Sequence, residues 1–335
     1  MAEASTSSYG RISPTALTLY ADLLQKVEVV QRQPGSISRK KVRGDTYLYA
    51  VEKHGQTRVQ RYLGPADDDR AAQEATLIQA EAQHARYRRT QVSMLKRAGV
   101  PGPSLEVGRL LEAVSRAGLF ESGLVLVGTV AFSLYAPIVG AVISAAFSMT
   151  QDADFAVASI ADTKGDGDLT TALRRADPSF QSTPGLSKAD LAKKFRAASG
   201  FEVEILTPIR RREDDGTVNV VGLGAGATPM HFLEFLIQDA IRAVALYNDG
   251  IKVTIPNPAR YAIHKLIIAQ ERSIGVAKRD KDLAQAAALI TILHANDPYL
   301  LHDTWEEARA RGPKWRTNIE RSMKTLSLTE KDLAP

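Results

Sequence analysis

The feature that most constrains the fold is an uncharged run at residues 123–149, GLVLVGTVAFSLYAPIVGAVISAAFSM. A run of this length must be buried, either in a bilayer or in a protein core. Gly128-Thr129, Pro137 and Gly140 interrupt a continuous helix, and no Lys/Arg cluster lies close to either end. We therefore predict a buried strand at 124–129 and a buried helix at 129–142. A membrane-spanning helix is the alternative.

Two aspartates follow this run at once, in TQDADF (150–155). Alternation predicts a strand at 152–158, on which Asp152 and Asp154 project to the same face while Ala153 and Phe155 project to the other. Two carboxylates this close repel each other unless a cation lies between them. Mg²⁺ (or Mn²⁺) prefers such hard oxygen ligands. The pair therefore predicts a metal site.

A third carboxylate lies on the predicted strand FEVEILTP (201–208). Glu202 and Glu204 share one face, and Val203 and Ile205 share the other. Such a carboxylate could bind the metal or accept a proton from an attacking hydroxyl. Glu204 is favoured over Glu202 because its flanks are more apolar.

Two further groups suit phosphate binding. Gly128 lets the backbone approach a ligand closely, and Thr129 adds a hydroxyl and helix N-terminal amides. Lys265 and Arg272 lie seven residues apart, so they share one helix face and could neutralise a triphosphate.

Together these motifs resemble the nucleotidyltransferase superfamily of DNA polymerase β type over roughly residues 120–290. The resemblance rests on a strand followed by Gly-Thr and a helix, then T-x-D-x-D-F, then a strand with Glu, then HKL with K-x-x-K-D-L. It is closest to uncharacterised bacterial proteins of this fold related to abortive-infection type IV and MenT-type toxins. The resemblance implies transfer of a nucleoside monophosphate from an NTP such as ATP to a hydroxyl.

The resemblance also implies residue roles. Asp152, Asp154 and Glu204 would bind Mg²⁺ (or Mn²⁺), and Gly128 and Thr129 would contact the triphosphate. Lys265 and Asp282 fall on further functional positions of the toxin-like group, with Asp280 competing with Asp282. RNA, tRNA or a protein hydroxyl would be the acceptor, and an antitoxin could be a partner. Gly-Thr replaces the usual Gly-Ser or Gly-Gly, and the gap from Thr129 to Asp152 is long. A catalytically degenerate regulator that binds nucleotide or nucleic acid is therefore an alternative.

The N-terminal third has a different composition. A helix is predicted at 14–33 and a long polar helix at 67–98, on either side of a β-meander at 35–65. The meander interleaves tyrosines with basic residues, namely Tyr47, Tyr49 and Tyr62 with Arg39, Lys40, Lys41, Arg43, Lys53, Arg58 and Arg61. Nucleic-acid binding and a solvated charged sheet both remain open.

The predicted fold is α+β, with a small mixed sheet as the catalytic core. The expected domains are 1–98, 104–229 and 230–335, after a linker at 98–104 and a helix that Ser104 caps and that runs to about 118. Residues 161–200 are polar, with a helix predicted at 187–198. From about 230 the chain is predicted to be mainly helical, interrupted by a strand at 251–256.

Several functions are excluded or disfavoured. The chain has no cysteine, which excludes disulfides and thiol chemistry, and its six histidines are scattered. The N-terminus has no apolar h-region, so a cytoplasmic protein is expected. The net charge of +5 permits a nucleic-acid partner. A rival pattern at 217–229, with Gly222, Gly224 and Gly226 after a predicted strand, suggests an NAD(P)-dependent oxidoreductase.

Overall fold

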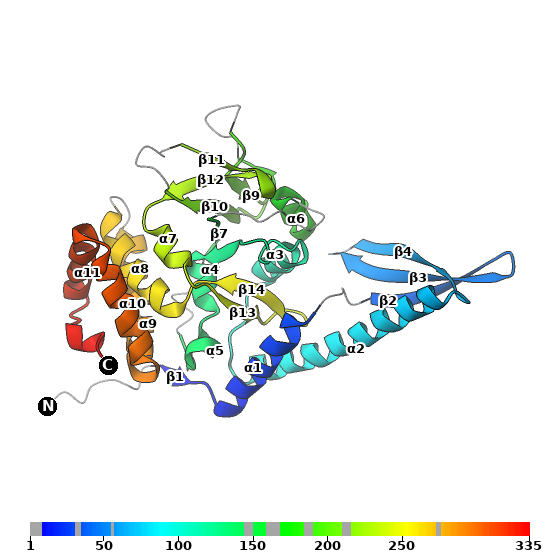
Figure 1. Ribbon diagram of the computed structural model, residues 1–335, viewed down its shortest axis with the longest axis horizontal. Coiled ribbons are helices and arrows are strands. Elements are labelled where there is room, and N and C mark those ends of the chain that lie inside the picture. The colour runs from blue at the N-terminus through cyan, green and yellow to red at the C-terminus, as the bar shows by residue number, and fades with distance from the viewer. Residues whose placement is uncertain are drawn as a thin grey trace.

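The computed structural model describes residues 9–30, 35–54, 57–143, 150–158, 168–183, 190–209, 216–272 and 276–335. It confirms the α+β class. A body built of a mixed sheet and helices carries an arm made of three strands and one long helix (Figure 1).

The central sheet has the strand order β11-β12-β10-β7-β5. Its strands are β5 (Val125–Val127), β7 (Asp152–Ala156), β10 (Glu202–Pro208), β11 (Val218–Val220) and β12 (Ala225–Met230). β7 runs parallel to β10 and antiparallel to β5. On its other side, β10 pairs first with β9 (Lys194–Arg196) and then with β12, and β9 also pairs with β8 (Gln181–Ser182).

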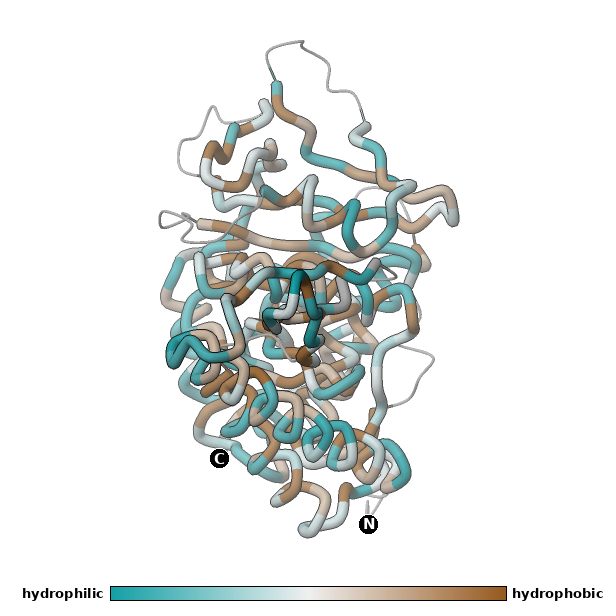
Figure 2. The backbone as a smooth tube through the Cα atoms, turned by 90° about the vertical axis from the view of Figure 1, so that its right-hand side faces the viewer, coloured by the Kyte–Doolittle hydropathy of each residue, from teal (hydrophilic) through white to brown (hydrophobic). Residues whose placement is uncertain are grey.

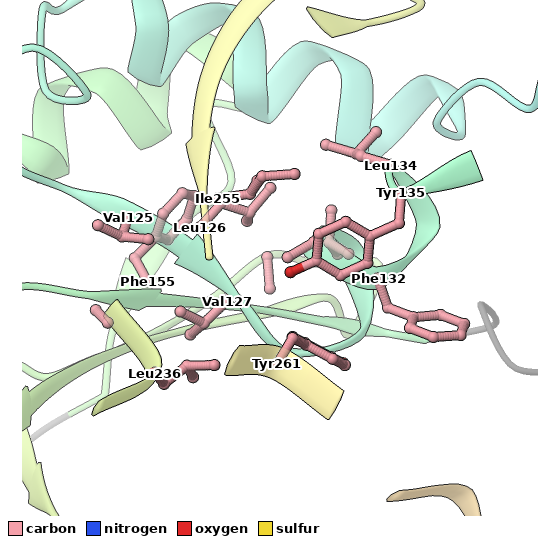
Figure 3. Close-up of a cluster of buried hydrophobic side chains, with 14 of the residues drawn as sticks. Val125, Leu126, Val127, Phe132, Leu134, Tyr135, Phe155, Leu236, Ile255 and Tyr261 are labelled. Carbon is pink, nitrogen blue, oxygen red and sulfur yellow. The ribbon is translucent and has the colours of Figure 1, made fainter. Parts of the chain in front are cut away.

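Alternation in β7 and β10 fixes which face is buried. Ala153 and Phe155 are almost fully buried, as are Val203 and Ile205 on the neighbouring strand. The carboxylates between them therefore lie together on the opposite face, as predicted. Figure 3 shows Phe155 within a core cluster that side chains of β5, α4 and α8 complete.

The uncharged run enters this core rather than a bilayer. It forms β5, α4 (Gly128–Ser133), α5 (Ala136–Val139) and β6 (Ala141–Val142), and residues 144–149 lie outside the described part. The predicted single helix at 129–142 is wrong, because Pro137 lies in the first turn of a new helix and Gly140 ends it at φ 74°. Among the described residues, no helix has the length and apolarity needed to cross a membrane.

Helices cover the rest of the body. They are α3 (Leu105–Arg116), α6 (Leu169–Ala176), α7 (Leu233–Ile237), α8 (Pro258–Glu271), α9 (Val276–Asn296), α10 (Pro298–Ala310) and α11 (Pro313–Thr325), with η3 (Glu330–Asp332) near the end of the chain. Ser104 caps α3 as predicted. Between α7 and α8, β13 (Ile241–Ala245) and β14 (Ile251–Ile255) form a hairpin, of which the sequence predicted β14 alone.

The helix predicted at 187–198 is also wrong. The helix expected at 187–198 is contradicted at its end, because Lys194–Arg196 is strand β9 and residues 184–189 lie outside the described part. Phe195 is buried against β10, and this pairing outweighs the helical propensity of its neighbours. The helix of the polar region 161–200 is instead α6.

The glycine-rich segment does not form a dinucleotide-binding turn. Gly222 lies in the short η2 turn (Val221–Leu223), and Gly224 at φ 63° leads into β12, which runs antiparallel to β11. A Cβ on Gly226 would collide with the Leu191 carbonyl oxygen, so this glycine serves close packing. A strand stands where the cofactor fold needs a helix, and the NAD(P) hypothesis is therefore wrong.

The arm matches the predicted N-terminal meander. It contains β2 (Gly35–Val42), β3 (Asp45–His54) and β4 (Thr57–Pro65), against which the first part of α2 (Asp69–Arg97) packs. The chain enters the arm through β1 (Gly10–Arg11), which pairs with β6, and α1 (Pro14–Glu28). Figure 2 views the molecule from the side of the arm and shows hydrophilic and hydrophobic residues alternating along most elements, as expected where each buries one face.

Candidate active site

A cavity of about 750 Å³ lies where the central sheet meets α8 and α9. All eight residues predicted as site residues line it, and they come from five parts of the chain: Gly128, Thr129, Asp152, Asp154, Glu204, Lys265, Arg272 and Asp282. The carboxylates of Asp152, Asp154 and Glu204 lie on the sheet side, and Lys265 and Arg272 lie on the helical side together with Asp282.

Asp154 is at the centre of the acidic side. In the sheet register it lies between Val127 of β5 and Glu204 of β10. Burial, with the charges of Asp152 and Glu204 adding to it, raises the pKa of Asp154 to about 7, although Lys265 and Lys278 act in the opposite direction. Without a cation beside it, Asp154 therefore ionises less readily than a free carboxyl group.

Gly128 makes room for this carboxylate. It opens α4 at φ 66°, and a Cβ placed on it would collide with an Asp154 carboxylate oxygen. Both the backbone conformation and the close approach therefore require glycine. Thr129 follows in the first turn of α4 and lines the same cavity.

The structure separates the two glutamates of β10. Glu204 lines the cavity, accepts a hydrogen bond from Thr228 at 3.0 Å and pairs with Lys194 at 3.1 Å. Glu202 pairs instead with Arg196 at 3.3 Å and is not among the residues that line the cavity. Geometry thus favours Glu204, but the ammonium of Lys194 already contacts its carboxylate.

The metal-binding potential rests on the two aspartates. Thr150 donates a hydrogen bond to Asp152. Within the described ranges, no group of three or more His, Asp or Glu side chains is arranged to hold a metal ion. Two carboxylates suffice for Mg²⁺, which keeps several waters and commonly completes its shell with substrate phosphates. The crowded charge around Asp154 fits a divalent cation.

On the helical side, Asp282 holds two cations. Lys265 Nζ lies 2.6 Å from one of its carboxylate oxygens and Arg272 Nε lies 2.6 Å from the other. Burial opposes ionisation of Asp282, but the two cations outweigh it and lower its pKa below the usual value. Asp280, the competing aspartate, is exposed on α9.

Two buried side chains of α8, Tyr261 and His264, also line the cavity. The Tyr261 hydroxyl lies 3.0 Å from the Gly128 carbonyl and 2.9 Å from Gln285 Oε1. His264 is buried, and burial together with the charge of Lys265 lowers its pKa to about 3. His264 is therefore a neutral packed residue.

Some lining residues were missed by the sequence reasoning. Lys278 and Lys281 of α9 line the cavity beside Asp282. Lys281 lies three residues and Asp282 four residues after Lys278, and this spacing could have indicated that all three share one helix face. Met230, His231 and Phe232 also line it, where the chain leaves β12. No sequence pattern marks that turn, where Phe232 adopts φ 64°.

Paired aspartates on a sheet, a Gly-Thr turn and facing cations define a site suited to phosphate-ester chemistry. The family model described as Nucleotidyltransferase matches residues 105–310. The chain belongs to this nucleotidyltransferase family. The match agrees with the superfamily that the motifs resemble.

Comparison with solved structures finds an antigenic nucleotidyltransferase-like protein from Paracoccidioides brasiliensis. It is 19% identical with a TM-score of 0.31, over 63% of this chain and 92% of that one. No curated protein matches the chain.

Proposed function

We propose that this protein transfers a nucleoside monophosphate from an NTP to a hydroxyl acceptor with the help of Mg²⁺ or Mn²⁺. The observation that carries this proposal is the meeting of Asp152 and Asp154 with Gly128 and the Lys265–Asp282–Arg272 cluster in one cavity. The acceptor oxygen attacks the α-phosphorus, the bond to the β-phosphate oxygen breaks, and pyrophosphate leaves.

Asp152 and Asp154 would hold the metal. A bound divalent cation would supply charge stabilisation for the leaving pyrophosphate and activation of the acceptor hydroxyl. The two carboxylates would hold the cation from β7, whose backbone is fixed by pairing with β5 and β10. Gly128 has no side chain and so leaves room for the Asp154 carboxylate in this position.

The cations of α8 and α9 would bind the phosphates. Asp282 uses one donor of Arg272 and one of Lys265, which leaves further N–H donors on both groups. Asp282 thus positions the two cations, and Thr129 adds a hydroxyl. Pro229, Met230, Phe232, Leu236 and Ile268 line the apolar part of the cavity and would contact the base.

Glu204 would take the proton of the acceptor hydroxyl or add to the metal ligands. Its carboxylate must then exchange Lys194 for the new partner. RNA, tRNA or a protein hydroxyl as acceptor, an antitoxin partner and a cytoplasmic location are implications of the toxin-like resemblance and stay predictions.

A second candidate is a regulator that binds nucleotide without turnover. The pairing of Glu204 with Lys194, and the lack of a three-ligand acidic cluster among the described residues, favour it. Thermal unfolding with Mg²⁺ and each NTP tests binding. If Mg²⁺–NTP stabilises the wild type and Asp152→Asn abolishes this stabilisation, the result supports the site. If none of the four NTPs stabilises the wild type, the result contradicts both candidates. Pyrophosphate release by the same samples separates the enzyme from the regulator.

A further inference from the structure

We propose that the outer face of the arm sheet, β2–β3–β4, binds single-stranded RNA. That the bound RNA is the acceptor of the transfer reaction rests on the proposed function, whereas the binding of RNA to the arm does not. We define the outer face by the residues that share it through their cross-strand pairing: Ser36, Ser38, Lys40, Tyr47, Tyr49, Val51, Arg58, Gln60 and Tyr62.

Three tyrosines form a platform on this face. Tyr49 and Tyr62 are direct cross-strand partners whose ring centroids lie 5.4 Å apart, and Tyr47 lies 6.1 Å from Tyr62. Tyr62 is 52% exposed. Exposed aromatic rings on a sheet are surfaces on which unpaired bases stack.

The opposite face explains why the rings do not serve the core. Leu48 and Ala50 of β3 are buried, and Leu48 clusters with Ala71 and Ala75 of α2. The arm therefore stabilises itself through its α2 side. The tyrosines contribute little to this small core and remain available to a ligand.

Positive charge is concentrated in the same sheet. Residues 35–65 contain seven Lys and Arg and two Asp and Glu, an excess of five that equals the net charge of the whole chain. The remaining residues are electrically balanced. Lys40 Nζ lies 4.6 Å from the centroid of the Tyr49 ring, so a cation stands at the level of the platform. Arg58 shares this face, whereas Arg39, Lys41 and Arg61 lie on the face of Leu48 and Ala50 and add to the positive potential around the sheet. Charge and rings together match a phosphate backbone with unstacked bases.

The polar residues favour RNA as the occupant. Ser36, Ser38 and Gln60 lie on the ring-bearing face and can hydrogen-bond a ribose 2′-hydroxyl. A duplex keeps its bases stacked, so it offers the rings no free base. An acidic peptide would use the cations and leave the rings without a specific partner.

The arm and the cavity are separate sites. α2 has 29 residues and is therefore about 43 Å long. Arg88, in its second half, anchors it to the body through Asp249 at 2.8 Å. In Figure 1 the sheet extends away from the body. RNA binding on the arm should therefore need neither NTP nor metal.

The test is fluorescence anisotropy with a labelled 12-nucleotide RNA, its DNA counterpart, its RNA duplex and an acidic peptide, all without NTP or metal. The ring variant carries Tyr47→Ser, Tyr49→Ser and Tyr62→Ser. Tyr299→Ser, which removes a 70% exposed tyrosine from α10, is the matched control. Circular dichroism shows whether the ring variant keeps its fold.

We expect the wild-type protein to bind single-stranded RNA more tightly than the other three ligands. The ring variant should bind this RNA about tenfold or more weakly than the wild type, and the control variant should bind it with unchanged affinity. Lys40→Gln with Arg58→Gln, both on the ring-bearing face, should reduce the dependence of log affinity on log salt by about 1.4, or about 0.7 per phosphate contact. This pair keeps the proposal testable if the ring variant misfolds.

Equal affinity for duplex and single strand, or for RNA and DNA, would overturn the assignment. So would RNA binding that neither arm variant weakens, tighter binding of the peptide, or no RNA binding at all. Asp154→Asn should bind RNA as the wild type does. RNA binding on the arm can therefore be confirmed even if the protein proves inactive, and nucleotidyl transfer can be confirmed even if the arm binds no RNA.

Discussion

Replacing Asp154 with asparagine should stabilise the metal-free protein while it removes metal binding. The substitution keeps the size of the side chain and deletes a charge that the fold holds against burial and two like charges. The folded-state pKa of about 7 lies above the ordinary aspartate pKa of 3.8. Ionisation of Asp154 therefore costs more free energy in the folded state than in the unfolded state, and this difference lowers the free energy of unfolding.

The pH range follows from the sign of this shift. Below about pH 4 the carboxyl is protonated in both states and its ionisation costs nothing. Between about pH 4 and pH 7 the unfolded chain ionises first, so the stability of the wild type falls as pH rises. Above about pH 7 both states are ionised and the loss is complete.

The size of the effect follows from about 1.4 kcal/mol for each unit of pKa shift. A shift of about three units gives about 4 kcal/mol as an upper bound, and partial exposure of Asp154 to the cavity reduces this to about 2–4 kcal/mol. Asp154→Asn should recover this amount at pH 8 and almost none of it at pH 4.

Thermal and urea unfolding in EDTA at pH 4, 6 and 8 measure this difference. Asp303→Asn removes an exposed carboxylate of α10 as a control and should change stability by less than about 0.5 kcal/mol. Millimolar Mg²⁺ should then stabilise the wild type and not Asp154→Asn. A gain in stability that is equal at pH 4 and pH 8, or a loss at pH 8, would refute the reasoning.

Three further substitutions test single contacts. Gly128→Ala should lower stability and activity more than Gly118→Ala does in unfolding and turnover assays, because both glycines have positive φ but only the Cβ at 128 meets the Asp154 carboxylate; equal losses would contradict this. Asp282→Ala should cost about 3–5 kcal/mol in urea unfolding because it leaves Lys265 buried without its partner, whereas Asp280→Ala on the exposed side should cost little. Arg88→Ala should increase hydrogen exchange in α2, because Arg88 joins Glu81 and Asp249 at 2.7 and 2.8 Å, and unchanged exchange would show that the arm is held elsewhere.

The site was more predictable than the elements around it. The strands of Asp154 and Glu204 could be predicted because one buried face imposes strict alternation, and the same alternation places the carboxylates together. The side chains of Lys265 and Asp282 could be placed in one cavity through family resemblance. Their direct contact depends on how α9 packs against α8, which no local pattern encodes.

The errors arose where tertiary pairing outweighs local preference. Phe195 enters a strand because β10 offers it a buried position, although its neighbours favour a helix. β13 was missed because a short strand becomes stable only when β14 pairs with it. The turn that carries Phe232 and the pairing of Glu204 with Lys194 both depend on neighbouring strands, so neither has a local signal.

The central claim is that Asp152 and Asp154 support nucleotidyl transfer in this cavity. The most direct measurement incubates the protein with Mg²⁺, each α-³²P-labelled NTP in turn, total RNA and cell lysate, beside the double variant Asp152→Ala/Asp154→Ala. We expect label on RNA or protein with the wild type, pyrophosphate in equal amount, and neither with the double variant. Label that persists in the double variant, or no label with any NTP and acceptor, would contradict the central claim.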